Sequence, residues 1–210
     1  SGSITQETKG LEMTMTIQQP VLEGQHVRLE PLSEAHVDGL FEIGQHQDDW
    51  AYLPTGAFTS RSDCEQWVKQ GLEFARKELH YPYVLVDPAT GDLMGSTRYL
   101  NVRPRDHGLE IGYTWLGRDY QRTAVNTEAK YLLLRHAFEV LGAYRVELKT
   151  DLRNQRSQKA IERLGAQKEG VLRRHMVVQN GYVRDSVMYS ITDQDWPRVK
   201  DNLRHKLMET

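Results

Sequence analysis

A polar turn between a strand pattern and a helix pattern holds the residues best suited to bind an anion. The segment runs from Trp115 to Glu128 and reads WLGRDYQRTAVNTE. The first amides of a helix have no partner within the helix, and the helix dipole favours negative charge, so a phosphate group suits this position. Arg122 adds a guanidinium beside these amides. An ordinary loop in which Asn126 caps the helix explains the residues equally well.

The elements that must position this turn follow from hydrophobic periodicity. Alternation of apolar and polar residues predicts strands, and apolar residues at helical spacing predict helices. In the strand before the turn, Leu109, Ile111, Tyr113 and Trp115 are predicted to share one face. The Asn180-Gly181 pair is a strong hairpin signal. The predicted strands cover 26–32, 81–86, 93–102, 108–116, 144–151, 171–179 and 182–191. The predicted helices cover 33–44, 62–79 (capped by Ser62 or Asp63), 127–141, 154–165 and 196–207.

The composition is that of an ordinary globular protein. Of the 210 residues, 39% are hydrophobic and 27% charged. A formal net charge of −2 argues against a broad basic surface for nucleic acid. No apolar run is long enough to span a bilayer, and no signal peptide is recognisable. Cys64 is the single cysteine, and the eight histidines are scattered. We therefore expect no disulfide, no metal, no membrane association and a cytoplasmic location.

The chain is predicted to form one domain over residues 20–210. Residues 1–19 are polar and aperiodic, and their Ser-Gly-Ser start is typical of a cloning remnant. We interpret them as a disordered extension. The order of strands and helices in the remainder predicts a mixed α/β fold.

This sequence resembles the GNAT acyltransferase superfamily. The resemblance rests on the order of elements, on the strand Glu110–Leu116 and the turn after it, and on the helix Asn154–Gly165. Two further segments, 169–174 and 185–190, resemble the branch of ribosomal-protein N-terminal acetyltransferases (RimJ/RimL-like). Membership would imply a mostly antiparallel twisted sheet, splayed between the fourth and fifth strands, with helices on both faces. It would also imply transfer of an acyl group, acetyl above all, from coenzyme A to an amine.

The resemblance assigns most of the donor site to one loop and one strand. The pyrophosphate loop of the superfamily, Gln/Arg-x-x-Gly-x-Gly/Ala, matches from Gln121, but Ala124 and Asn126 occupy its glycine positions. Glycine would allow positive φ and close approach to phosphate. We therefore expect the loop to bind coenzyme A more weakly or with a changed geometry, and loss of binding is the alternative. The splayed strand is expected to pair with the pantetheine arm. The implied coenzyme A contacts are Thr114, Trp115, Leu116, Gln121, Arg122, Thr123, Ala124, Val125, Asn126, Thr127 and Asn154, the last of which could equally be a plain helix cap.

The resemblance also suggests the catalytic groups. Attack by an amine needs a neutral nitrogen and benefits from a proton donor for the leaving thiolate. Many members supply a tyrosine seven residues after the asparagine, but Ile161 stands there. In the RimL-like branch a serine three residues after it lies near the sulfur, which corresponds to Ser157. Glu110 is the best candidate for a general base acting through water. Ser157 could instead be a small residue that allows close packing, and Glu110 an exposed or hydrogen-bonded sheet glutamate.

The expected acceptor is a primary amine, either a small molecule or a protein N-terminus, and the sequence does not identify it. Candidates near it by location are Trp50, Tyr52, Phe58, Arg98, Tyr99 and His175, although each is readily explained by packing. Two rival functions are a non-catalytic acyl-CoA-binding module on the same fold and an enzyme that uses another donor such as succinyl-CoA. A homodimer is expected because members of the branch often pair.

Overall fold

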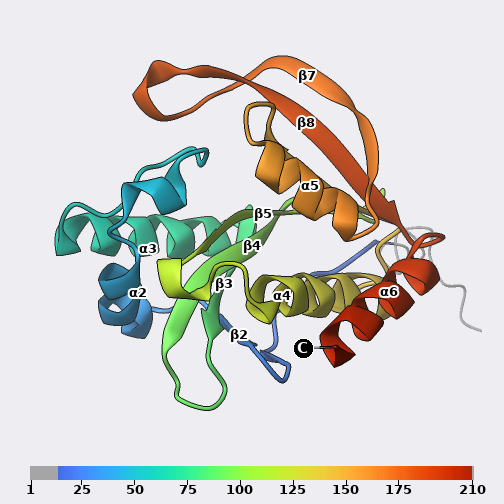
Figure 1. Cartoon of the computed structure of the whole chain (residues 1–210), viewed down its shortest axis with the longest axis horizontal. Helices are drawn as coiled ribbons and strands as arrows, with labels where there is room; N and C mark the ends of the chain where they lie inside the picture. The colour runs from blue at the N-terminus through green and yellow to red at the C-terminus, as the bar shows by residue number, and fades with distance from the viewer. Residues whose placement is uncertain (1–13, 210) are drawn as a thin grey trace, which may run out of the picture.

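The computed structural model describes residues 14–209, which form one eight-stranded sheet in the order β1-β2-β3-β4-β5-β6-β8-β7 (Figure 1). Every neighbouring pair is antiparallel except β5 and β6, which are parallel. The predicted mixed, mostly antiparallel sheet is therefore confirmed. The strands are β1 (Leu22–Glu23), β2 (Arg28–Pro31), β3 (His80–Val86), β4 (Leu93–Arg103), β5 (Gly108–Leu116), β6 (Arg145–Asp151), β7 (Gln167–Val177) and β8 (Val183–Thr192).

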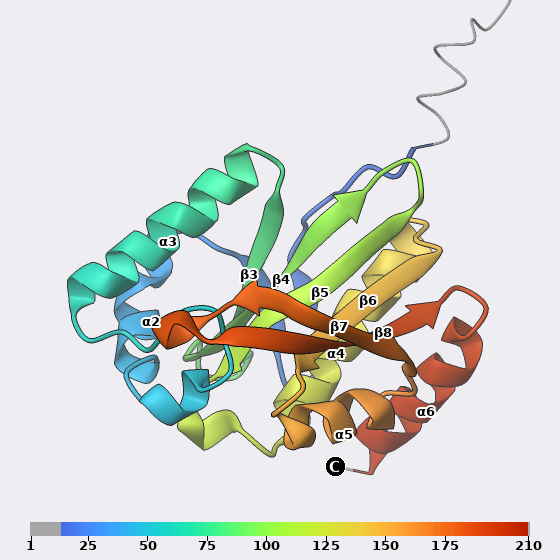
Figure 2. The ribbon, with the colours of Figure 1, turned by 90° about the horizontal axis from the view of Figure 1, so that it is seen from above.

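Helices cover both faces of the sheet, as predicted, and enclose two separate hydrophobic cores (Figure 2). One core lies between the sheet and two helices, and it contains Leu133 of α4 and Leu203 of α6, both fully buried. The other lies on the opposite face and contains Leu40 of α2 and Val68 of α3. The helices are α2 (Val37–Ile43), α3 (Arg61–Arg76), α4 (Ala124–Arg135), α5 (Gln155–Arg163) and α6 (Trp196–Met208).

The sheet opens between β5 and β6. Only three residue pairs join these strands, from Gly108 opposite Arg145 to Glu110 opposite Glu147. Beyond Glu110 the strands diverge, so residues 111–116 of β5 have no strand partner on that side. The splay expected between the fourth and fifth predicted strands is confirmed, since these strands correspond to β5 and β6.

A bulge in β5 overturns the prediction that its alternate residues share one face. Gly112 pairs with Arg98, but Trp115 pairs with Ser96, so β5 carries one extra residue here. Tyr113 lies at the bulge with a φ of 53°. One extra residue reverses the alternation of side chains. Ile111 consequently packs in the α4 core, whereas Trp115 packs in the α3 core.

Two predicted helix starts are wrong. Helix α4 begins at Ala124 and is capped by Thr123, whose Oγ1 accepts a hydrogen bond from the Val125 amide at 3.3 Å. Asn126 therefore lies within the helix and does not cap it. Helix α3 is capped by Ser60, and not by Ser62 or Asp63.

The final hairpin forms where it was predicted. Asn180 and Gly181 both have positive φ, 61° and 71°, as a tight turn between antiparallel strands requires. The β7–β8 hairpin arches over α5 and reaches toward the segment after α2 (Figure 1).

Residues 14–19, which we had placed in a disordered extension, contact the fold. Met15 is 4% exposed, and its amide donates to the Pro104 carbonyl at 3.0 Å. Gln19 Nε2 donates to the Pro82 carbonyl at 2.7 Å. Residues 1–13, the rest of that predicted extension, lie outside the described residues. Over residues 14–209, no helix has the length and apolar character needed to cross a membrane.

Candidate active site

A cleft of about 1240 Å³ occupies the gap between the diverging strands. Its walls are β5 on one side and β6 with α5 on the other, and the start of α4 closes one end. Nine basic residues line it against three acidic ones, which makes it suited to an anionic ligand. The basic residues are Arg122, Lys130, Lys149, Arg153, Arg156, Lys159, Arg163, Arg184 and Lys206, and the acidic ones are Asp48, Asp49 and Glu110.

The structure brings most of the predicted site residues to this cleft. It is lined by Glu110, Thr114, Trp115, Leu116, Gln121, Arg122, Thr123, Asn126, Thr127, Asn154 and Ser157. The exceptions are Ala124 and Val125, of which Val125 is 8% exposed and packs in the α4 core. Trp115 lines the cleft as part of β5, but its ring packs against the ring of Trp50, with the two ring centroids 4.5 Å apart.

The turn before α4 has a geometry that needs no glycine at positions 124 and 126. Both residues are helical, and the positive φ of this turn, 60°, falls on Arg122. The replacement of the two glycines therefore does not itself strain the loop, and its effect on coenzyme A binding stays a prediction. Gln121 Nε2 donates to Asp49 Oδ1 at 2.8 Å and to the Leu116 carbonyl at 3.0 Å, which fixes the turn against the end of β5.

Asn154 caps α5 and borders the cleft at the same time. Its Oδ1 accepts from the Ser157 amide at 3.1 Å, which is the helix-cap geometry. Ser157 lies in the first turn of the same helix and also lines the cleft. Ile161, at the position where a proton donor would stand, is 7% exposed and packs in the core.

Glu110 is a buried carboxylate at the point where the strands separate. It is 2% exposed, and its Oε1 accepts from Asn101 Nδ2 at 2.7 Å and from Lys149 Nζ at 3.2 Å. These two contacts hold the carboxylate at the bottom of the cleft. Both partners come from neighbouring strands, β4 and β6.

Two polar residues lie on the face of α4 that borders the cleft: Asn126, which was predicted as a coenzyme A contact, and Lys130, which was not predicted. Lys130 is 7% exposed, and its Nζ donates to Thr114 Oγ1 at 2.7 Å. Burial lowers the pKa of Lys130 to about 8. Asn126 Oδ1 is buried and accepts no hydrogen bond from the residues that the structure describes. The sequence signal was available, since a lysine at position 130 interrupts an otherwise apolar helix stripe.

Most candidates for the acceptor end are core residues. Trp50, Phe58, Tyr99 and Arg98 are each at most 3% exposed. His175 is exposed, and its Nδ1 lies 2.8 Å from Ser186 Oγ. Desolvation, with the charges of Lys149 and Arg184, lowers the pKa of His175, which favours a neutral imidazole.

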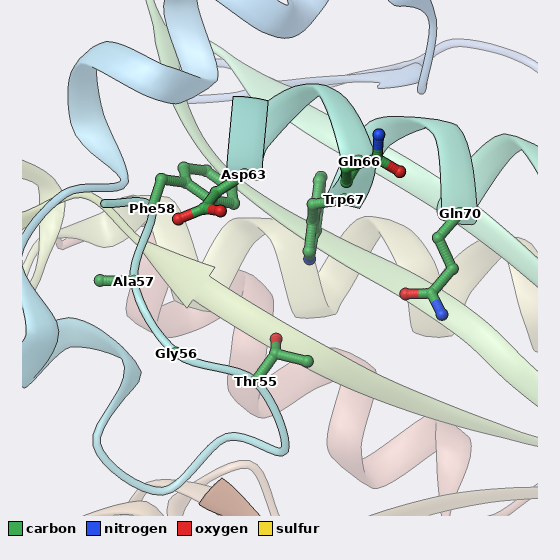
Figure 3. A pocket seen from close by; sticks show the side chains of 8 residues that line it. All are labelled: Thr55, Gly56, Ala57, Phe58, Asp63, Gln66, Trp67 and Gln70. Carbon is green, nitrogen blue, oxygen red and sulfur yellow. The ribbon is translucent and has the colours of Figure 1, made fainter. Parts of the chain in front are cut away.

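A second, smaller cavity of about 460 Å³ lies between α3 and the segment 55–58 (Figure 3). Thr55, Trp67 and Gln70 point into it (Figure 3). Residues 51–54 of the same segment line the large cleft. One stretch of chain therefore separates the two hollows.

Gln179 ties the tip of the β7–β8 hairpin to that stretch. Its Nε2 donates to the carbonyls of Trp50 and Leu53 at 2.8 Å and of Thr55 at 2.9 Å. Gln47 Nε2 in turn donates to Gln179 Oε1 at 2.8 Å. These hydrogen bonds, called the Gln179 clasp below, join the hairpin tip to a segment that includes cleft-lining residues 51–54.

Replacing Gln179 by alanine is expected to lower the free energy of unfolding by about 2 kcal/mol, because three carbonyls lose a shared donor. Amide hydrogen exchange should quicken in residues 47–58. Gln45→Ala is the matched control, since Gln45 Nε2 makes one exposed bond to the Phe41 carbonyl. Equal effects of the two changes in urea denaturation would contradict the clasp.

Within residues 14–209, no three His, Cys, Asp or Glu side chains gather as metal ligands would. Cys64 is fully buried, and burial raises the pKa of its thiol to about 11.

The fold and the site together are those of an acyl-CoA-dependent N-acyltransferase. The mixed sheet is splayed, a basic cleft lies between the diverging strands, and the N-terminus of α4 lies at one end of that cleft. The comparisons place the chain within that class. Residues 26–167 match the acetyltransferase (GNAT) domain family. This chain belongs to the GNAT acetyltransferase family, and it is an N-acetyltransferase.

Relatives and solved structures agree with this assignment. YdaF of Bacillus subtilis, assigned as a ribosomal N-acetyltransferase, is 32% identical over 82% of this chain and 94% of its own length. The ribosomal protein uS5-alanine N-acetyltransferase of Escherichia coli is 27% identical over 59% of this chain and 63% of its own. A GCN5-related N-acetyltransferase from Brucella melitensis superposes with a TM-score of 0.86 at 29% identity, covering 91% of this chain and 87% of its own.

Proposed function

We propose that this N-acetyltransferase moves the acetyl group of acetyl-CoA to the free N-terminal amine of a protein. The observation that carries the donor half is the divergence of β5 from β6 after Glu110. It leaves the backbone groups of residues 111–116 free, on that side, to pair with an extended ligand arm, as an added strand would. The names of two relatives, which refer to ribosomal proteins, support a protein acceptor.

The residues present fit coenzyme A. The amides at the start of α4 and the Arg122 guanidinium would hold its phosphates, and the nine basic residues of the lining complement its negative charge. Asn154 and Thr114 would hold the pantetheine arm from opposite walls. The thioester, when bound, supplies an activated acyl group with a good leaving group.

Two side chains would take part in the proton transfers of the reaction, Glu110 as an acceptor and Ser157 as a donor. Glu110, held by Asn101 and Lys149, would accept the proton of the attacking amine through a water molecule. Ser157, on the first turn of α5, would donate a hydrogen bond to the departing thiolate. A thiol has a pKa of about 8.5, so the thiolate leaves with little help and the contribution of Ser157 is modest.

The experiment that tests this function measures thiol release from acetyl-CoA with a panel of acceptors. We expect turnover with peptides that have a free N-terminus and none with the same peptides blocked by an N-terminal acetyl group. Turnover with small amines alone would contradict the protein acceptor, and faster turnover with succinyl-CoA would contradict acetyl as the acyl group. Saturable binding without thiol release would indicate a non-catalytic module. Gel filtration with light scattering tests the predicted homodimer, and a cytoplasmic location stays a prediction.

Asn154 and Ser157 should separate binding from turnover. Asn154→Ala is expected to raise the KM for acetyl-CoA about tenfold, because the arm loses a hydrogen bond and α5 loses its cap. Ser157→Ala should lower kcat a few-fold and leave the KM nearly unchanged. Steady-state kinetics with varied acetyl-CoA distinguish the two effects. An unchanged kcat in Ser157→Ala would remove Ser157 from the catalytic groups.

A further inference from the structure

Lys130 is a buried lysine that makes no ion pair with any residue of 14–209. It lies on α4, lines the large cleft and is 7% exposed. Its pKa is lowered by burial alone, with no charged neighbour contributing. Its Nζ contact is with a neutral hydroxyl, Thr114 Oγ1, at 2.7 Å. Since burying an amine costs free energy unless its hydrogen bonds are made, such a position calls for a further acceptor.

The partner of Lys130 lies on the strand expected to pair with the ligand arm. Thr114 follows the β5 bulge at Tyr113, and its hydroxyl also lies 2.9 Å from Thr97 Oγ1. An ammonium group has three donors and a neutral amine has two, so at least one N–H of Lys130 remains for another acceptor in either state. A ligand that runs along β5 passes this donor.

Asn126 extends the same surface one helical turn toward the start of α4. Residues four apart on a helix lie on one face, and both Asn126 and Lys130 line the cleft. Among the described residues, 14–209, the buried Oδ1 of Asn126 has no hydrogen-bond partner. Helix α4 thus has an acceptor without a partner among the described residues, Asn126 Oδ1, and one turn later a donor with an N–H to spare, Lys130 Nζ. An amide-containing chain, which alternates N–H and C=O groups, complements that pair.

We infer that Lys130 and Asn126 bind the acyl-pantetheine arm of the donor, with Lys130 Nζ donating to a carbonyl oxygen of the arm and Asn126 Oδ1 accepting from one of its N–H or O–H groups. This inference rests on the proposed function for its ligand. The two residues form a third wall, on α4, in addition to the walls made by β5 and Asn154. Lys130 acts here as a positioning residue.

The test compares a ligand that has the arm with one that lacks it. Calorimetry should show that Lys130→Met weakens acetyl-CoA binding about tenfold, the effect of one hydrogen bond from a charged or buried donor. The same variant should bind 3′-phosphoadenosine 5′-diphosphate, the nucleotide half alone, as tightly as the unmodified protein does. Lys69→Met, which removes the same charge from the exposed face of α3, should bind both ligands normally.

Each result of the binding measurements either supports or overturns the inference about Lys130. Equal weakening for both ligands would show that Lys130 acts by general electrostatics, and no weakening would show that it is structural; either result overturns the inference. Binding of the nucleotide half also reports that Lys130→Met is folded. If that variant does not fold, Asn126→Ala must show the same arm-specific loss for the inference to stand. Absence of acetyl-CoA binding by the unmodified protein would overturn the proposed function itself.

Discussion

Glu110→Gln is expected to lower kcat about 100-fold while changing the KM for acetyl-CoA little. The substitution keeps the shape of the side chain and its place between Asn101 and Lys149, but it removes the group that would accept the amine proton. General-base catalysis typically contributes a factor of this size or more. Steady-state kinetics with varied acetyl-CoA and varied amine give the two constants.

Glu147 provides the control for this change. It lies directly opposite Glu110 in the parallel β5–β6 pairing, but its Oε1 is engaged by Arg103 at 2.9 Å and Arg145 at 3.0 Å. It does not line the cleft. Glu147→Gln should therefore leave kcat within about twofold. A kcat equally preserved in Glu110→Gln would refute the assignment of Glu110 as the base.

Gly95→Ala is expected to cause the largest loss of stability among the substitutions considered. A Cβ at this position would lie 2.1 Å from the Trp115 carbonyl oxygen and 2.9 Å from the Leu116 Cα. Both are backbone atoms of β5, so the clash can be relieved only by moving the cleft wall. We expect the free energy of unfolding to fall by about 3 kcal/mol, together with weaker acetyl-CoA binding. Urea denaturation and calorimetry measure the two effects.

Gly170 isolates the steric part of that loss. Its φ of 152° is close to the 158° of Gly95, but no atom would lie within 4 Å of its Cβ. Both alanines carry a similar backbone penalty, so the difference between them should be about 2 kcal/mol. Similar free energies of unfolding in the two variants would mean that the backbone of β5 at Trp115 moves at little cost and relieves the clash.

Periodicity was sufficient where a strand buries one face, as in β6, whose residues alternate between buried and half-buried. The Asn180-Gly181 turn was predicted from local chemistry, and the structure shows both residues at positive φ. The β5 bulge could not be predicted, because it depends on the pairing of β5 with β4 and places a tyrosine at positive φ. The start of α4 was misplaced because Thr123 and Asn126 are both good caps, and only the three-dimensional structure decides between them.

The site was predictable where it depends on the order of elements and missed where it depends on burial. The cleft contains the predicted Glu110 of β5 and the predicted Asn154 and Ser157 at the start of α5, two segments far apart in the sequence. Lys130 was missed because a lysine on a helix is ordinarily solvated, and its burial follows from the packing of α4 against β5. The acceptor candidates Trp50 and Phe58 proved to be core residues, since aromatic side chains in a loop can turn inward as readily as outward.

The aromatic cluster around Trp115 should determine the intrinsic tryptophan fluorescence of the protein. Three of its four tryptophans, Trp50, Trp67 and Trp115, lie within 6.3 Å of one another by ring centroid. The indole N–H groups of Trp50 and Trp115 are buried without a partner, so their emission should lie at short wavelength. Trp115 belongs to the cleft wall, and these rings are close enough to exchange excitation. The intrinsic fluorescence should therefore report any ligand that shifts β5, without a label.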